Sequence, residues 1–184
     1  DALGWEELEF PSAEYTAGLR FTVIETEMHH LWDFGWLDLT RFKVEGTVDD
    51  PRDGFDVLCA FLRDPISQRT FGPWGEPSLL HGPFLSDKLD PGWFRQLTDG
   101  EFSERVHANL NDPEFYEPPS TEQQVPVMAW IETVKTRGDA VFALEAPDDE
   151  DLRVEWHFVW TIYHEYASVS PDLKELVVAV IGFD

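Results

Sequence analysis

The chain of 184 residues has one cysteine, few cations and no long apolar segment. Cys59 alone allows neither a disulfide framework nor a cysteine-based zinc site, and its apolar neighbours predict a buried, inert thiol. No uncharged apolar run approaches about 18 residues, so we expect no membrane-spanning helix. Because nucleic acids and anionic membranes need a basic footprint, the shortage of cations argues against both as partners.

Motifs that announce catalysis are also missing. Glycine-rich phosphate loops, zinc-protease helices, nucleophile elbows and EF-hand loops do not occur. Cys59 lies in an apolar run, which raises the pKa of a thiol and hides it from substrates. We therefore predict no catalytic residue and no cofactor.

The sequence is rich in acidic and aromatic residues. There are 37 aspartates and glutamates against 13 lysines and arginines, a net charge of −24. Hydrophobic residues make up 42% of the sequence and aromatic residues 14%, which argues against global disorder. A chain of this length buries roughly 70% of its unfolded surface, so we expect one domain over residues 1–184.

The strongest periodic signal covers residues 152–166. Its even positions from Leu152 to Ile162 are apolar and its odd positions mostly polar, which predicts a strand with one face in the core. Trp156, Phe158 and Trp160 would then point inward. Glu155, His157, Tyr163 and Glu165 would point outward.

The remaining patterns predict an α+β fold with a mainly antiparallel sheet, a C-terminal meander and about three short helices in the middle of the chain. Further strands are expected at residues 19–26, 37–48, 55–62, 69–71, 140–144 and 176–183. Helices are expected over residues 90–100 and 102–110, and between Pro126 in a first turn and a C-cap at Gly138. Residues 28–36 and 72–92 are interpreted as irregular.

Two kinds of side-chain constellation could carry a function. Glu155 and His157 share one strand face, and His29 and His30 follow Glu27; three or four such ligands would suit zinc or iron. Solvated histidines are the favoured interpretation, so we predict no metal. The second constellation is a set of candidate binding residues, in which carboxylates pair with a basic partner and aromatic rings anchor it: Asp148, Asp149, Glu150, Glu155, His157, Tyr163, Glu165, Tyr166 and Trp74.

The leading functional hypothesis is a non-catalytic, acidic interaction protein that inhibits a basic protein partner by occlusion. Its general profile resembles that of bacterial immunity proteins, antitoxins and DNA mimics, although no family motif is matched. The alternative is a β-rich domain that binds a carbohydrate or small molecule or acts as a metal-dependent enzyme, with a pocket made by residues 72–93, Glu155, His157, His81 and Tyr163. A third possibility is acidity that is general to the proteome of the host. The expected location is the cytoplasm, and the oligomeric state stays open.

Overall fold

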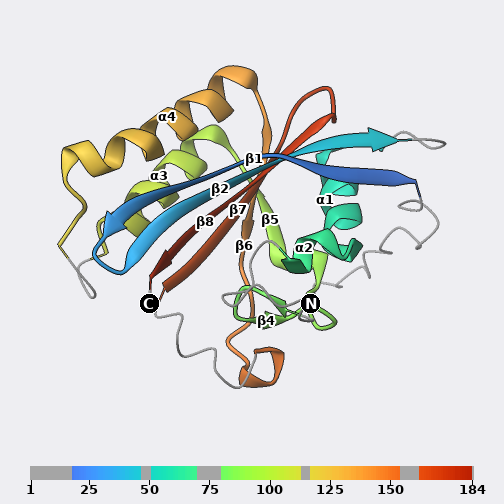
Figure 1. Ribbon diagram of the computed structural model, residues 1–184, viewed down its shortest axis with the longest axis horizontal. Coiled ribbons are helices and arrows are strands. Elements are labelled where there is room, and N and C mark those ends of the chain that lie inside the picture. Colours follow the sequence, from blue (N-terminus) through green and yellow to red (C-terminus); the bar gives the residue numbers. More distant parts are fainter. Residues whose placement is uncertain (1–17, 47–50, 70–79, 113–116, 154–161, 184) are drawn as a thin grey trace, which may run out of the picture.

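The computed structural model describes residues 18–46, 51–69, 80–112, 117–153 and 162–183. Six strands form one antiparallel sheet in the order β1-β2-β8-β7-β6-β5 (Figure 1). They are β1 (Leu19–Trp32), β2 (Gly35–Gly46), β5 (Phe94–Leu97), β6 (Ala140–Leu144), β7 (Ile162–Val169) and β8 (Glu175–Phe183). A separate small hairpin joins β3 (Leu80–His81) to β4 (Phe84–Leu85). The α+β class and the C-terminal meander are confirmed.

The three longer helices each begin at a residue whose side chain caps the first turn. The helices are α1 (Gly54–Arg63), the single turn α2 (Ile66–Arg69), α3 (Asp99–Leu110) and α4 (Thr121–Arg137). Thr98 and Ser120 each form a capping box, with Glu101 and Gln123 respectively. Gly138 ends α4 in the left-handed conformation at φ 75°, as the predicted glycine C-cap requires. Two 3₁₀ turns, η2 (Pro91–Trp93) and η3 (Glu150–Leu152), complete the described elements.

The central strands of the sheet are buried on both faces. Leu176, Val178 and Val180 of β8 pack in a core with α1, whereas Ala179 and Ile181 pack in a second core with α3 and α4. Because alternate side chains of a strand point to opposite faces, the two cores lie on opposite sides of the sheet. Figure 1 shows α3 and α4 together over one part of the sheet, away from α1. The continuous apolar run of β8 is therefore that of a strand covered on both sides.

Residues 55–62 form helix α1, so the prediction of a central strand there is wrong. The Asp53 side chain accepts from the backbone N–H of Asp56 and caps the helix. The guanidinium group of Arg52 donates two hydrogen bonds to the Asp56 carboxylate. These bonds hold the pKa of that carboxyl below its ordinary value. A fully buried helix and a buried strand give the same apolar run. The predicted burial of Cys59 is confirmed, and it raises the pKa of the thiol to about 11.

The helix predicted over residues 90–100 is also wrong. Asp90 does cap a turn, and its side chain accepts from the N–H of Gly92. The turn ends after Trp93 and becomes strand β5, which pairs with β6 from Phe94↔Leu144 to Leu97↔Val141. Pairing with a neighbouring strand outweighs the local helix signal.

Several boundaries differ from prediction. The strands β1 and β2 run through most of residues 28–36, which were expected to be irregular, and turn only at Asp33 and Phe34. Of the strand expected over residues 69–71, Arg69 is instead the last residue of the helical turn α2, and residues 70–71 lie outside the described residues. Helix α4 begins at Thr121, so Pro126 lies inside it rather than in its first turn.

The strand predicted over residues 152–166 is described only at its ends. Arg153 forms an isolated bridge with Phe84, and β7 begins at Ile162. Residues 154–161, with Trp156, Phe158 and Trp160, lie outside the described residues. In β7 the expectation of a solvent-facing side is wrong, because Glu165 and Tyr166 on successive positions are both buried.

Candidate functional site

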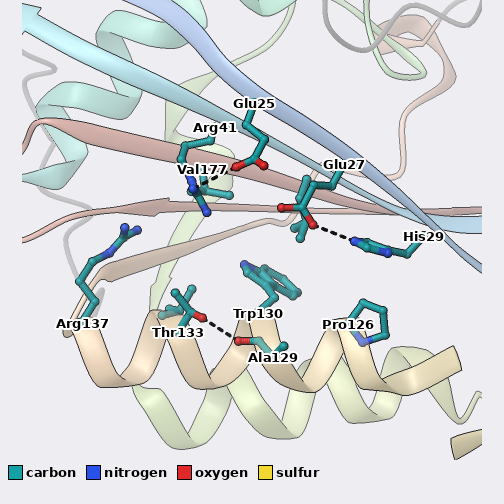
Figure 2. Close-up of a pocket in the computed structure, with 12 residues that line it drawn as sticks. Glu25, Glu27, His29, Arg41, Pro126, Ala129, Trp130, Thr133, Arg137 and Val177 are labelled. Atoms are coloured by element: carbon teal, nitrogen blue, oxygen red, sulfur yellow. Dashed lines mark hydrogen bonds and ion pairs between the residues drawn. The ribbon is translucent and has the colours of Figure 1, made fainter. Parts of the chain in front are cut away.

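A groove runs between helix α4 and the outer strands of the sheet (Figure 2). Its volume is about 320 Å³, near the lower end of the roughly 300–1,000 Å³ of ligand pockets. The strands contribute Glu25, Glu27, His29, Leu39, Arg41 and Val177. The helix contributes Pro126, Ala129, Trp130, Thr133, Val134 and Arg137.

A bulge in β1 places the acidic residues on the groove side. Phe21 packs in the core with α1, whereas Glu25 lines the groove beside α4. Both positions are odd, so strict alternation would put them on one face; the register shift between Val23 and Glu25 exchanges the faces. Glu25 and Glu27 therefore point toward α4.

The groove wall is formed by cross-strand and along-strand pairs. Glu25 lies directly opposite Arg41 of β2, and Arg41 Nη1 donates to Glu25 Oε2 at 3.1 Å. Glu27 contacts His29, which follows it by two positions in β1: His29 Nε2 lies 2.9 Å from Glu27 Oε2. All four side chains are partly exposed. They form a polar rim that a ligand would meet first.

The inner end of the groove is a network of two arginines and two further carboxylates. Arg137 binds both oxygens of Asp139, from Nε at 2.6 Å and Nη2 at 2.7 Å, and its Nη1 donates to Glu175. The hydrogen bond with Asp139, more than any other contact, raises the pKa of the Arg137 guanidinium. Arg41 Nε lies 3.5 Å from Glu175 Oε1. The groove lining thus holds two carboxylates, Glu25 and Glu27, and two guanidinium groups. Asp139 and Glu175 bind the arginines from outside the lining, so the network as a whole has more carboxylates than guanidinium groups.

Trp130 forms the apolar floor. It is 7% exposed, and its ring packs edge-on against Phe102 and Tyr166 at centroid distances of 5.1 and 5.7 Å. Among the described residues its indole Nε1–H has no hydrogen-bond acceptor. A buried donor without an acceptor is unfavourable by about 1–3 kcal/mol. In Figure 2 the ring rises from α4 toward the strands.

His81, Tyr163 and Glu165, expected in or near a pocket, meet inside the protein instead. His81 Nε2 lies 2.7 and 2.8 Å from the two oxygens of Glu165, and the Tyr163 hydroxyl donates to Glu165 Oε2 at 2.6 Å. The side chains of His81 and Glu165 are 0% and 1% exposed. Burial, followed by the charge of Glu165, raises the pKa of Tyr163. Glu165 is consequently not available as a surface carboxylate.

Tyr166 is buried as well and does not project as an anchor. Its hydroxyl accepts from Asn109 Nδ2 at 2.5 Å, and burial raises the pKa of the phenol. The acidic loop is different. Asp148, Asp149 and Glu150 are all exposed, although Asp149 also caps the turn η3 by accepting from the N–H of Asp151. Asp148 has a long contact of 3.6 Å with Arg153.

Three candidate binding residues, Trp74, Glu155 and His157, lie outside the described residues. Within the described ranges no group of three or more histidine, cysteine, aspartate or glutamate side chains could hold a metal ion. The pairing of Glu27 with His29 was visible in the sequence, where the two residues are two apart. The role of Trp130 was not visible in the sequence, because only the folded helix brings it under β1.

Comparison with protein-family models, with curated proteins and with solved structures finds no match for this chain. None of the helices in the described ranges is long and apolar enough to cross a membrane. The functional conclusion therefore rests on the surface and the groove of this protein alone.

Proposed function

We propose that this protein is a non-catalytic, acidic interaction protein that binds and inhibits a basic protein partner, in the manner of an immunity protein or antitoxin. It acts by occlusion, with its carboxylates pairing with lysine and arginine side chains of the partner. The proposal includes a cytoplasmic location.

The observation that carries the proposal is how the few cations are used. The sequence has 13 lysines and arginines. Within the described residues, eight of them form ion pairs with carboxylates of the same chain: Arg20, Arg41, Lys43, Arg52, Arg95, Arg105, Arg137 and Arg153. Thirteen cations cannot neutralise the 37 carboxylates of the sequence. The excess negative charge therefore attracts positively charged molecules in solution and accelerates association with a basic partner.

The loop from Asp148 to Asp151 illustrates the available charge. All four of its acidic side chains are exposed, and the side chain of Asp148 is 99% exposed. Exposed carboxylates of this kind steer a basic partner and set the salt dependence of binding. They contribute specificity through the charge pattern rather than through a desolvated anchor.

The test has two stages. The immobilised protein is first exposed to host lysate at about 50 mM and about 500 mM salt, since screening weakens exposed pairs. A basic protein retained only at low salt is then purified, and its activity is measured against increasing amounts of this protein. We expect stoichiometric inhibition that weakens with salt. Retention of no basic protein, or retention without inhibition, would overturn the proposal.

A second candidate function is the binding of a small molecule in the groove. It is favoured by one observation, that His29 converges there with Glu25 and Glu27 beside an apolar floor. Cationic metabolites such as arginine and spermidine are the matching probes. A rise in melting temperature with such a probe, lost in Glu25→Gln/Glu27→Gln, would favour this candidate over the first.

A further inference from the structure

We propose that an extended, basic segment of the partner protein adds to the free edge of β1 and places its cationic side chains in the groove beside α4. This inference rests on the proposed function and deepens it, because it names where and in what conformation the partner binds. The occupant is a peptide segment in β conformation, bound by strand addition.

The first observation is the edge itself. β1 is 14 residues long and is the first strand of the sheet, and in the described part of the chain it pairs only with β2. The opposite edge strand, β5, has four residues. Long exposed edges are templates for another strand, so proteins normally shorten or cover them. Val23, Ile24 and Met28 of β1 are 46%, 55% and 59% exposed, which gives an added strand apolar neighbours.

The second observation is the charge of the groove face. Glu25 and Glu27 point into the groove two positions apart. Alternate side chains of an added strand have the same spacing on the same face. Lysine or arginine at every second position of the segment would therefore meet Glu25 and Glu27 in turn.

The third observation is independent of charge. Trp130 is buried to more than nine-tenths, lines the groove and carries an indole N–H without an acceptor among the described residues. A peptide carbonyl oxygen is such an acceptor. A polyamine offers only donors and cannot supply one. The groove thus matches a ligand that has both cations and carbonyl groups.

A second copy of this chain fits the same edge less well. Each copy carries a net charge of −24, and antiparallel pairing of two β1 edges would bring their glutamates together. Like charges facing each other across strands are destabilising. A basic segment removes this repulsion and replaces it with attraction.

The test uses a fluorescein-labelled decapeptide of alternating lysine and valine, with fluorescence anisotropy at low salt. We expect binding that is weakened about tenfold by Glu25→Gln/Glu27→Gln and about 2–10-fold by Trp130→Phe, which removes one hydrogen-bond donor. The matched control, Asp87→Asn/Glu104→Gln, removes the same charge at two exposed positions outside the groove and should change the affinity less than twofold. Melting temperatures confirm that each variant is folded.

A second measurement needs no variant of the protein. The same peptide with N-methyl groups at every residue keeps its charge but loses the N–H groups of both of its edges, including those that would pair with β1. We expect it to bind at least about tenfold more weakly. Equal binding of both peptides would overturn strand addition, and so would a dimer formed through β1. If a basic protein partner is inhibited yet responds to Asp148→Asn/Asp149→Asn and not to Glu25→Gln/Glu27→Gln, the groove inference fails while the proposed function stands.

Discussion

His81 and Glu165 lie 84 positions apart in the chain, and their side chains are in direct contact inside the protein, with Nε2 of His81 at 2.7 and 2.8 Å from the two carboxylate oxygens. The contact ties the β3–β4 hairpin to strand β7. Tyr163 donates to the same carboxylate at 2.6 Å. The three groups resemble a catalytic constellation in composition, but the burial of His81 and Glu165 gives them a structural role.

Replacing Glu165 tests that role. Glu165→Ala removes the acceptor of two buried side chains, and we expect a loss of about 3–5 kcal/mol in the free energy of unfolding. Glu165→Gln, which keeps one acceptor oxygen, should lose less. Urea denaturation measures both. The control is Glu104→Ala on the exposed face of α3, expected within about 0.5 kcal/mol of wild type. A similar loss in Glu165→Ala and in the control would contradict the structural role.

Gly82 is required beside this cluster for two reasons. Its φ is 55°, and an added Cβ would lie 2.3 Å from Cζ of Tyr163. Gly138 also has a positive φ, of 75°, but a Cβ added to it would have no other atom within 4 Å. Gly138→Ala should therefore lose only the roughly 1–2 kcal/mol of left-handed backbone strain, whereas Gly82→Ala should lose this and also displace Tyr163. Thermal unfolding of the two variants compares them directly; equal losses would show that the ring moves aside without penalty.

The sequence predicted those elements whose signals are local. The cations and glycine at the end of α4, the i, i+4, i+8 spacing of Phe102, Val106 and Leu110, and the apolar run of β8 all specified their structures correctly. The run at residues 55–62 did not, since every residue from Val57 to Leu62 is buried. A run of six consecutive apolar residues is too short to separate a buried helix from a buried strand.

The groove could not be predicted for a different reason. It depends on a bulge in β1 and on the packing of α4 beside that strand. No residue pattern in the sequence indicates either feature. Glu25, Glu27 and His29 are spaced for one strand face, and the sequence shows that spacing. Which face they occupy was decided by the register shift after Val23. The contact of His81 with Glu165 of β7 could not be predicted either, because His81 comes from a hairpin that is distant in the sequence.

Glu101 should make the stability of α3 depend on pH. Its carboxylate accepts from the backbone N–H of Thr98 at 2.8 Å and from Arg95 at 3.0 Å. These hydrogen bonds, the backbone one first, lower the pKa of Glu101 to about 2 from 4.5. A pKa that is lower in the folded state stabilises the protein above the unfolded value, and the benefit is lost as the pH falls through the folded value.

Wild type should accordingly be more stable than Glu101→Gln at pH 7, and the difference should shrink between about pH 4.5 and about pH 2. Melting temperatures over this range measure it. In the Arg95→Gln background a reduced pH dependence should persist, because the Thr98 N–H still donates. A difference that stays constant down to pH 2 would contradict the assignment of the low pKa.

Cys59 should react with thiol reagents only when the protein opens. The residue is 1% exposed on α1, and burial, more than any nearby charge, raises the pKa of its thiol to about 11. At pH 8 both the thiolate fraction and access are therefore low. We expect labelling by a disulfide reagent to be at least about 1,000-fold slower in the folded protein than in urea, in line with the folding equilibria of small domains. Thr136→Cys in a Cys59→Ala background provides an exposed thiol on α4 that should react at once. Equally fast labelling of Cys59 in the folded protein would mean that α1 opens readily and that this thiol is reachable.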